Sequence, residues 1–129
     1  MTLRVLLVDD AEDIRVIARM SLERVGGMRV VAVSSGEAAI EAVTGDGPFD
    51  VVLLDVMMPG MDGPSTLEAL REKGLEAQVP VVFLTAKGQP SERQRLGSLG
   101  VVGVISKPFD PLELPGELGR LLDQAPYPT

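Results

Sequence analysis

The chain has 129 residues, a length typical of one domain, and a formal net charge of -7 at pH 7. Hydrophobic residues make up 45% of it but aromatic residues only 3%, so a core must be built mainly from aliphatic side chains. The sequence contains neither Cys nor His, which excludes disulfides, thiolate chemistry, zinc-finger spacings and histidine general base catalysis. The negative charge also argues against binding to nucleic-acid phosphates.

The first apolar run, from Leu3 to Val8, contains Arg4 and stops at Asp9. It is far shorter than a signal-peptide core or a membrane span. The absence of Cys fits a reducing compartment. We therefore expect a cytoplasmic protein without a membrane partner.

Five apolar runs alternate with stretches of helical character, which predicts an α/β fold of repeated βα units. The runs are continuous rather than alternating, as in parallel strands that are buried on both faces. The predicted strands are Leu3 to Val8, Met28 to Val33, Val51 to Leu54, Val81 to Leu84 and Val101 to Ile105.

The first two helices are marked by their ends. Between the first two strands, apolar residues recur at helical spacing and Gly26-Gly27 supplies the stop. The second helix is predicted to begin at Ser34, whose hydroxyl can cap it while Glu37 completes a capping box. It is predicted to end before Gly45.

The third helix is predicted from near Pro64 to Gly74. The fourth, around Ser91 to Leu99, is a short polar segment among glycines, and we expect it to be mobile or irregular.

The last helix is announced by Asp110, an expected N-cap. Pro115 cannot donate to the carbonyl four positions back, so a late start or a kink in the first turn is expected. The domain is predicted to span residues 1–124, and residues 125–129 a flexible tail.

Polar side chains follow four of the five predicted strands. In an open α/β sheet, ligands bind beyond the carboxyl ends of the strands, where the strand order reverses. With a strand order of 2-1-3-4-5, these residues would crowd one edge: Asp9, Asp10, Asp55, Thr85 and Lys107.

Three neighbouring carboxylates repel one another, and a divalent cation such as Mg²⁺ or Mn²⁺ would relieve the repulsion. Lys107 adds a positive charge, and the hydroxyl of Thr85 adds a donor. These groups could neutralise a transferring phosphoryl group, with the Asp55 carboxylate as the nucleophile that forms an acyl phosphate.

Each of these residues also has an ordinary structural interpretation. Asp9 and Asp10 could cap the first helix, Asp55 could belong to a turn, Thr85 could cap a helix, and Lys107 could lie in a solvated loop. Their joint placement at one sheet edge is much harder to obtain from turn chemistry.

The chain resembles the response-regulator receiver family, the CheY-like phosphoacceptors of two-component systems, from Leu3 to about Gln124. The resemblance implies a flavodoxin-like fold, with a five-stranded parallel sheet of order 2-1-3-4-5 and five helices. The matching segments are Val8-Asp9-Asp10, Asp55-Val-Met-Met-Pro-Gly-Met-Asp-Gly63, Thr85-Ala86 and Lys107-Pro108-Phe109.

The resemblance implies that Asp55 accepts a phosphoryl group from a histidine kinase or a histidine phosphotransfer protein. Mg²⁺, or Mn²⁺ in its place, would be held by Asp10 directly, by Asp9 through water or a hydrogen bond, by Asp55, and by the backbone carbonyl of Met57. Thr85 would contact the phosphoryl oxygens.

Lys107 would contact the same oxygens, and a cis peptide bond would precede Pro108. Met57 and Lys87 would influence the access of water to the acyl phosphate. In this family an aromatic residue often stands three positions before the lysine and swings inward as the threonine moves. Here that position is Val104, and the glycines around the fourth helix could offer a substitute through low local stability.

The implied function is signalling in a phosphorelay, by a phosphoacceptor without separate substrate turnover. A stand-alone receiver would change its binding to a downstream protein, and the face of helix 4, strand 5 and helix 5 could carry a homodimer. The alternatives are a receiver segment of a larger regulator and a phosphorylation-independent interaction module.

A haloacid dehalogenase-type phosphatase is disfavoured, because it needs a second Asp two residues after the nucleophile. Asp10 is followed by Ala11-Glu12, and Asp55 by Val56-Met57.

Overall fold

A computed structural model describes residues 2–86 and 89–124 of the chain. Its five strands are all parallel and form one sheet in the order β2-β1-β3-β4-β5, as predicted. The order reverses beside β1, so the connections on either side of it leave in opposite directions. The strands are β1 (Arg4–Val8), β2 (Arg29–Val33), β3 (Val51–Asp55), β4 (Val81–Thr85) and β5 (Gly103–Ser106).

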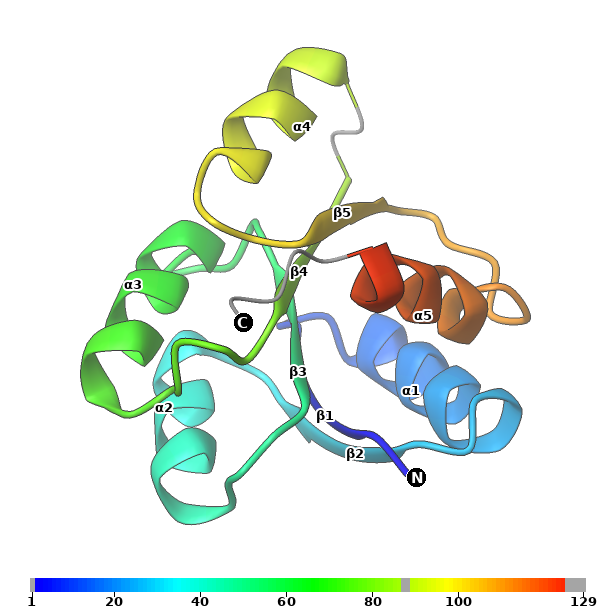
Figure 1. Ribbon diagram of the computed structural model, residues 1–129, viewed down its shortest axis with the longest axis horizontal. Coiled ribbons are helices and arrows are strands. Elements are labelled where there is room, and N and C mark those ends of the chain that lie inside the picture. The colour runs from blue at the N-terminus through cyan, green and yellow to red at the C-terminus, as the bar shows by residue number, and fades with distance from the viewer. Residues whose placement is uncertain (1, 87–88, 125–129) are drawn as a thin grey trace.

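Helices cover both faces of the sheet, with α1 and α5 on one side and α2, α3 and α4 on the other (Figure 1). None of the helices within residues 2–86 and 89–124 is long and apolar enough to cross a membrane. The α-helices are α1 (Glu12–Met20), α2 (Gly36–Gly45), α3 (Gly63–Lys73), α4 (Pro90–Gly97) and α5 (Leu114–Gln124).

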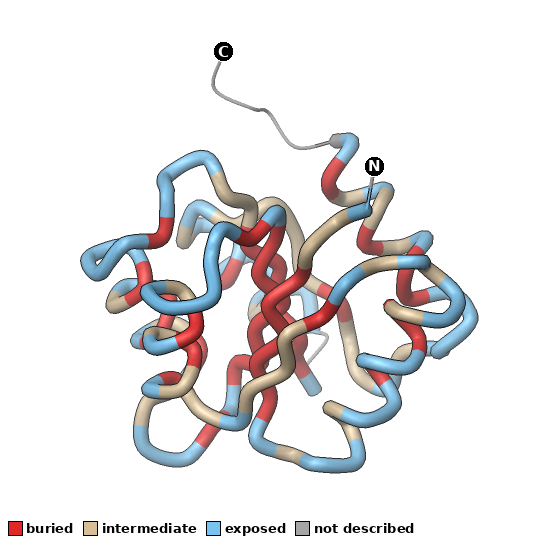
Figure 2. The backbone as a smooth tube through the Cα atoms, turned by 90° about the horizontal axis from the view of Figure 1, so that it is seen from below, coloured by how far each residue is buried: buried red, intermediate tan, exposed pale blue. Residues whose placement is uncertain are grey.

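Alternate strand residues divide the core into two layers. Val5 and Leu7 of β1 pack with α1 and α5, whereas Leu6 and Val8 pack with the helices of the opposite face. Every residue of β3 and β4 is buried, and the centre of the sheet is the most enclosed part of the chain (Figure 2). This two-sided burial explains why the strands read as continuous apolar runs.

The chain leaves α1 through a π-helical turn, Ser21–Val25, before it reaches the predicted stop. Gly27 has a positive φ of 67°, a conformation that glycine adopts without strain. The helix therefore ends where the two glycines predicted it would end.

The capping prediction for α2 is wrong by one residue. Ser35, rather than Ser34, is extended and accepts a hydrogen bond from the Ala38 N–H at 3.1 Å. This shift puts Ala38 at the third helical position, so Glu37 is one position too early for a capping box. The helix also includes Gly45 rather than ending before it.

The late start of α5 is confirmed, but Asp110 caps a turn before the helix instead of the helix itself. Its carboxylate accepts from the Leu112 N–H at 2.9 Å, and its carbonyl accepts from the Leu114 N–H at 2.9 Å. Pro115 then falls in the first turn of α5, where a missing N–H costs no helical hydrogen bond.

Further boundaries of strands and helices differ from the predictions by one or two residues. Strand β5 begins at Gly103, two residues later than predicted, and α4 is a regular helix of eight residues. The irregularity predicted for α4 is therefore wrong, and the predicted mobility stays a prediction. The predicted tail, residues 125–129, lies outside the described residues.

Replacing Ser35 by Ala is expected to lower the free energy of unfolding by about 1 kcal/mol, because the Ala38 N–H loses its capping partner. Ser34→Ala is the matched control and should change stability by only a few tenths of a kcal/mol. Urea denaturation of the two variants distinguishes the caps. A larger loss in Ser34→Ala would contradict the assignment.

Candidate phosphoacceptor site

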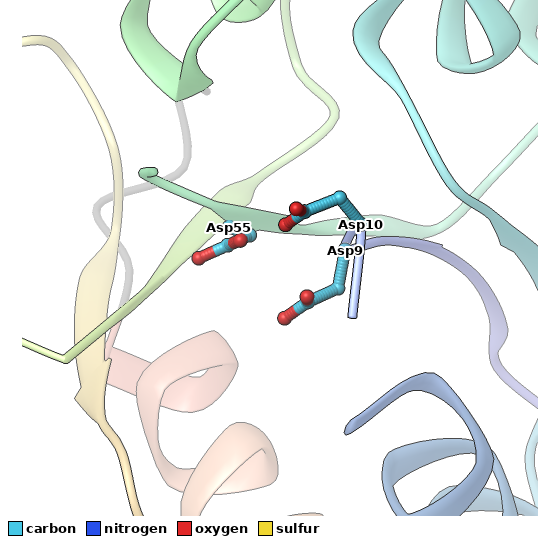
Figure 3. A group of neighbouring side chains, drawn as sticks. All are labelled: Asp9, Asp10 and Asp55. Atoms are coloured by element: carbon cyan, nitrogen blue, oxygen red, sulfur yellow. The ribbon is translucent and has the colours of Figure 1, made fainter. Parts of the chain in front are cut away.

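Three carboxylates meet at the carboxyl ends of two neighbouring strands. Asp9 and Asp10 follow β1, and Asp55 is the last residue of β3. The register pairs Val8 with Leu54, so Asp9 comes beside Asp55. Carboxylate oxygens of all three residues lie within 4.8 Å of one another (Figure 3).

A lysine that follows the edge strand β5 joins these carboxylates. Lys107 follows β5, and its Nζ donates to Asp9 Oδ2 at 2.7 Å and to Asp55 Oδ1 at 3.0 Å. Its side chain is only 16% exposed. The peptide bond between Lys107 and Pro108 is cis, as the resemblance implied.

Burial differs among the three carboxylates. Asp9 is fully buried and Asp55 is 3% exposed, whereas Asp10 is exposed at the rim. Burial raises the pKa of Asp55 to about 6; the hydrogen bond from Lys107 acts in the opposite direction, and the charge of Asp9 adds to the rise. Burial alone would lower the pKa of Lys107, but its bonds to Asp9 and Asp55 outweigh that effect and raise it.

The charge balance suits a divalent cation. Three carboxylates against one ammonium leave an excess of two negative charges in a partly buried crevice. Carboxylate oxygens are the ligands that Mg²⁺ and Mn²⁺ prefer in proteins. The donor set formed by Asp9, Asp10 and Asp55 could therefore hold such an ion.

Two other predicted residues, Thr85 and Met57, lie at the end of β4 and just beyond the end of β3. Thr85 is buried at the end of β4, one residue beyond Leu84, which pairs with Asp55. Met57 lies two residues after Asp55 and is 62% exposed. Lys87 lies outside the described residues.

The site depends on two further residues whose roles the sequence did not reveal. A Cβ on Gly63 would lie 2.6 Å from the carbonyl oxygen of Asp55, so only glycine lets α3 begin so close to Asp55. Arg15 Nη1 donates to the carbonyl of Asp9 at 2.8 Å. Gly63 stands in a recognisable turn motif, whereas an arginine on a helix carries no such signal.

The alternative that Asp9 and Asp10 only cap α1 is wrong. Ala11 occupies the N-cap position, and the Asp9 carboxylate accepts from the Ala11 N–H at 2.9 Å. The same carboxylate also receives Lys107 through its second oxygen. Asp9 thus shapes the loop and belongs to the charged group.

Asp55→Asn is expected to raise the free energy of unfolding at pH 7.5 without divalent cations, by on the order of 1–3 kcal/mol. The folded-state pKa of Asp55 lies above the ordinary 3.8, so the folded chain binds the proton more tightly than the unfolded chain. The stability from this group is present at low pH and is lost as the pH rises to about 6 and beyond.

Urea denaturation with a chelator, at pH 4 and pH 7.5, measures this difference. The gain from Asp55→Asn should shrink toward pH 4, and added Mg²⁺ should stabilise the unaltered chain more than the variant. A variant that is no more stable than the unaltered chain at pH 7.5 would contradict the electrostatic account.

Known proteins share both this sequence pattern and this fold. The family model described as "Response regulator receiver domain" matches residues 5–118. The transcriptional regulatory protein CpxR of Escherichia coli (strain K12) is 36% identical over 119 residues, which cover 92% of this chain and 49% of CpxR. The sensor histidine kinase GacS of Pseudomonas protegens is 38% identical over 114 residues, covering 86% of this chain and 12% of GacS.

The structure of the chemotaxis response regulator CheY4 of Vibrio cholerae superposes with a TM-score of 0.85 at 30% identity, covering 94% of this chain and 99% of CheY4. The chain spans about half the length of the transcriptional regulators that it matches. The family model, the sheet order and the solved structure agree. The chain belongs to the response regulator receiver family of two-component signalling.

Proposed function

We propose that this receiver accepts a phosphoryl group on Asp55 from a histidine kinase or a histidine phosphotransfer protein, in a reaction that depends on Mg²⁺. The observation that carries the proposal is the environment of Asp55. Its buried carboxylate lies among the carboxylates of Asp9 and Asp10 and is held by the ammonium of Lys107. Acidic groups for a cation and a fixed positive charge thus flank one nucleophile.

In the proposed step, an Asp55 carboxylate oxygen attacks the phosphorus of the donor's phosphohistidine. The phosphorus–nitrogen bond breaks, and the imidazole leaves with its electron pair while an acyl phosphate forms on Asp55. The Lys107 ammonium is within reach of the oxygens that gain charge, and the Thr85 hydroxyl can donate to them. Fixed charges and donors of this kind stabilise the transition state without reorganisation.

The proposed ligands of the cation are the carboxylates of Asp9, Asp10 and Asp55 and the backbone carbonyl of Met57. A bound Mg²⁺, or Mn²⁺ in its place, would neutralise the negative charge shared by the carboxylates and the incoming phosphoryl oxygens. The excess of two negative charges at the site supports this assignment. Burial is the main cause of the raised pKa of Asp55, and the negative charge of Asp9 adds to it.

The proposed role of the chain is that of a signalling phosphoacceptor in the cytoplasm, without turnover of a separate substrate. Output would pass to a downstream protein, or to a further domain in a longer regulator like those it matches. A homodimer through the face of α4, β5 and α5 is a further form that this output could take. Nucleic acid is not proposed as a direct partner, because the net charge is -7.

An exposed apolar surface supports a protein as the phosphodonor. This surface, the α1 patch, consists of Val16, Ile17, Met20, Val25 and Leu112. A hydrogen bond from Ser21 to the Pro111 carbonyl ties the end of α1 to the loop that follows Lys107. Four of the patch residues belong to the helical stretch that follows Asp10, and the patch could bind the donor's helices.

A small acyl phosphate such as acetyl phosphate, supplied with Mg²⁺, is expected to add one phosphoryl group to the chain. The added mass should be absent in Asp55→Asn and greatly reduced when Mg²⁺ is chelated. Intact-mass spectrometry over a time course measures both. An unmodified chain under these conditions would support the phosphorylation-independent module instead.

Ile17→Ala combined with Met20→Ala is expected to slow phosphoryl transfer from a protein donor by about tenfold or more, because apolar contact area is lost. The rate with acetyl phosphate should stay within about twofold, since neither side chain belongs to the charged group. The protein donor for this test is chosen from a panel of autophosphorylated histidine kinases as the one that phosphorylates the unaltered chain fastest. Equal slowing with both donors would argue against a docking role for the α1 patch.

A further inference from the structure

Helix α4 has little apolar anchorage. Leu96 is the one buried side chain among the residues of α4, Pro90–Gly97. By comparison, α3 buries the two apolar side chains Leu67 and Leu70. Polar contacts therefore carry a larger share of what holds α4 against the sheet, and such contacts depend steeply on distance and angle.

One arginine makes such a contact. Arg93 of α4 reaches the edge strand β5 with both ends of its guanidinium group. Its Nη1 donates to the carbonyl of Val104 at 3.2 Å, and its Nη2 donates to the hydroxyl of Ser106. The planar fork thus spans two positions of β5, including the Val104 position where an aromatic relay would otherwise stand.

The segment of β5 held by Arg93 is the one that meets the acceptor site. Ser106 pairs with Thr85 across the β4–β5 ladder, and the N–H of Lys107 donates to the Thr85 carbonyl at 2.7 Å. Lys107 in turn binds Asp55. A continuous path therefore runs from Asp55 through Lys107 and Ser106 to Arg93.

We propose that Arg93 is the positioning residue that couples phosphorylation of Asp55 to the position of α4, in place of the missing aromatic relay. The inference rests on the function proposed above. A phosphoryl group on Asp55 draws Lys107 and Thr85 toward its oxygens and displaces the end of β5. The displaced Ser106 no longer fits the Arg93 fork, and α4 is released from β5.

The Val104 side chain is a poor relay by itself. It is half-buried against the core cluster that contains Phe83 and Leu96, and it pairs with Phe83 in the sheet. A short aliphatic side chain has few rotamers and no polar group with which to follow the movement of Thr85. Arg93, by contrast, contacts the strand backbone and a hydroxyl next to Lys107 at the same time.

Arg95 provides a matched control on the same helix. Its Nη2 pairs with Glu92 at 2.7 Å, and both residues belong to α4, so this ion pair stays within the helix. Arg95→Ala removes the same charge and a similar side chain as Arg93→Ala. It leaves the contact between α4 and β5 in place.

The test is amide hydrogen exchange of α4 in the full chain, with and without Mg²⁺ and beryllofluoride, a mimic of the phosphoryl group. In the unaltered chain the mimic should speed exchange in α4 by about two- to tenfold, the range expected for one or two lost hydrogen bonds. Arg93→Ala and Ser106→Ala should exchange faster already without the mimic and respond little to it. Arg95→Ala should respond like the unaltered chain, and Arg93→Lys, which lacks the fork, should resemble Arg93→Ala.

Phosphorylation of Asp55 by acetyl phosphate is measured on the same samples and should change by less than about twofold in Arg93→Ala. If the unaltered chain is phosphorylated and Arg93→Ala still responds fully to the mimic, the relay is overturned while the proposed function stands. If the unaltered chain takes up no phosphoryl group, the proposed function fails and the relay fails with it.

Discussion

The ammonium of Lys107 lies between two buried carboxylates, at 2.7 Å from Asp9 and 3.0 Å from Asp55. Like charges brought together away from water would repel one another strongly, and the lysine offsets only part of that repulsion. Burial of Asp55, together with the negative charge of Asp9, raises the pKa of Asp55 to about 6. The proposed binding of a cation and the proposed acceptance of a phosphoryl group both rest on this incomplete neutralisation.

The negatively charged residues of the site lie at the ends of interior strands of the sheet, whereas the positively charged residue follows an edge strand. Asp9 and Asp55 extend from β1 and β3, interior strands whose ends are held by neighbours on both sides. Lys107 follows β5, an edge strand that is paired on one side only. The acidic part of the site is therefore the more rigidly held part, and the proposed displacement on phosphorylation would be easier toward β5 and α4.

Much of the fold could be predicted because its signals are local. Continuous apolar runs predicted the five strands, and Pro115 predicted the late start of α5. The cap of α2 was misplaced because Ser34 and Ser35 are chemically equivalent, and only the backbone path makes the second one the cap. The start of β5 was predicted too early, because valines at positions 101 and 102 favour a strand in the sequence. In the structure the strand begins only at Gly103.

The site was predictable for a different reason. Once the strands are parallel and ordered 2-1-3-4-5, any polar residue after a strand must lie at one edge, so Asp9, Asp55 and Lys107 could be brought together without coordinates. The sequence by itself determined which chemical groups are present there. It therefore also determined the class of chemistry that they can perform.

Only the tertiary structure decided which of those groups contact one another. It also decided which contacts connect the site to α4 at the surface. The contact of Arg93 with β5 joins a helix and a strand that each look ordinary in the sequence. The close approach of Gly63 to Asp55 likewise depends on the path of the loop between them. Such contacts depend on distances between segments, and a linear pattern of residue types contains no distances.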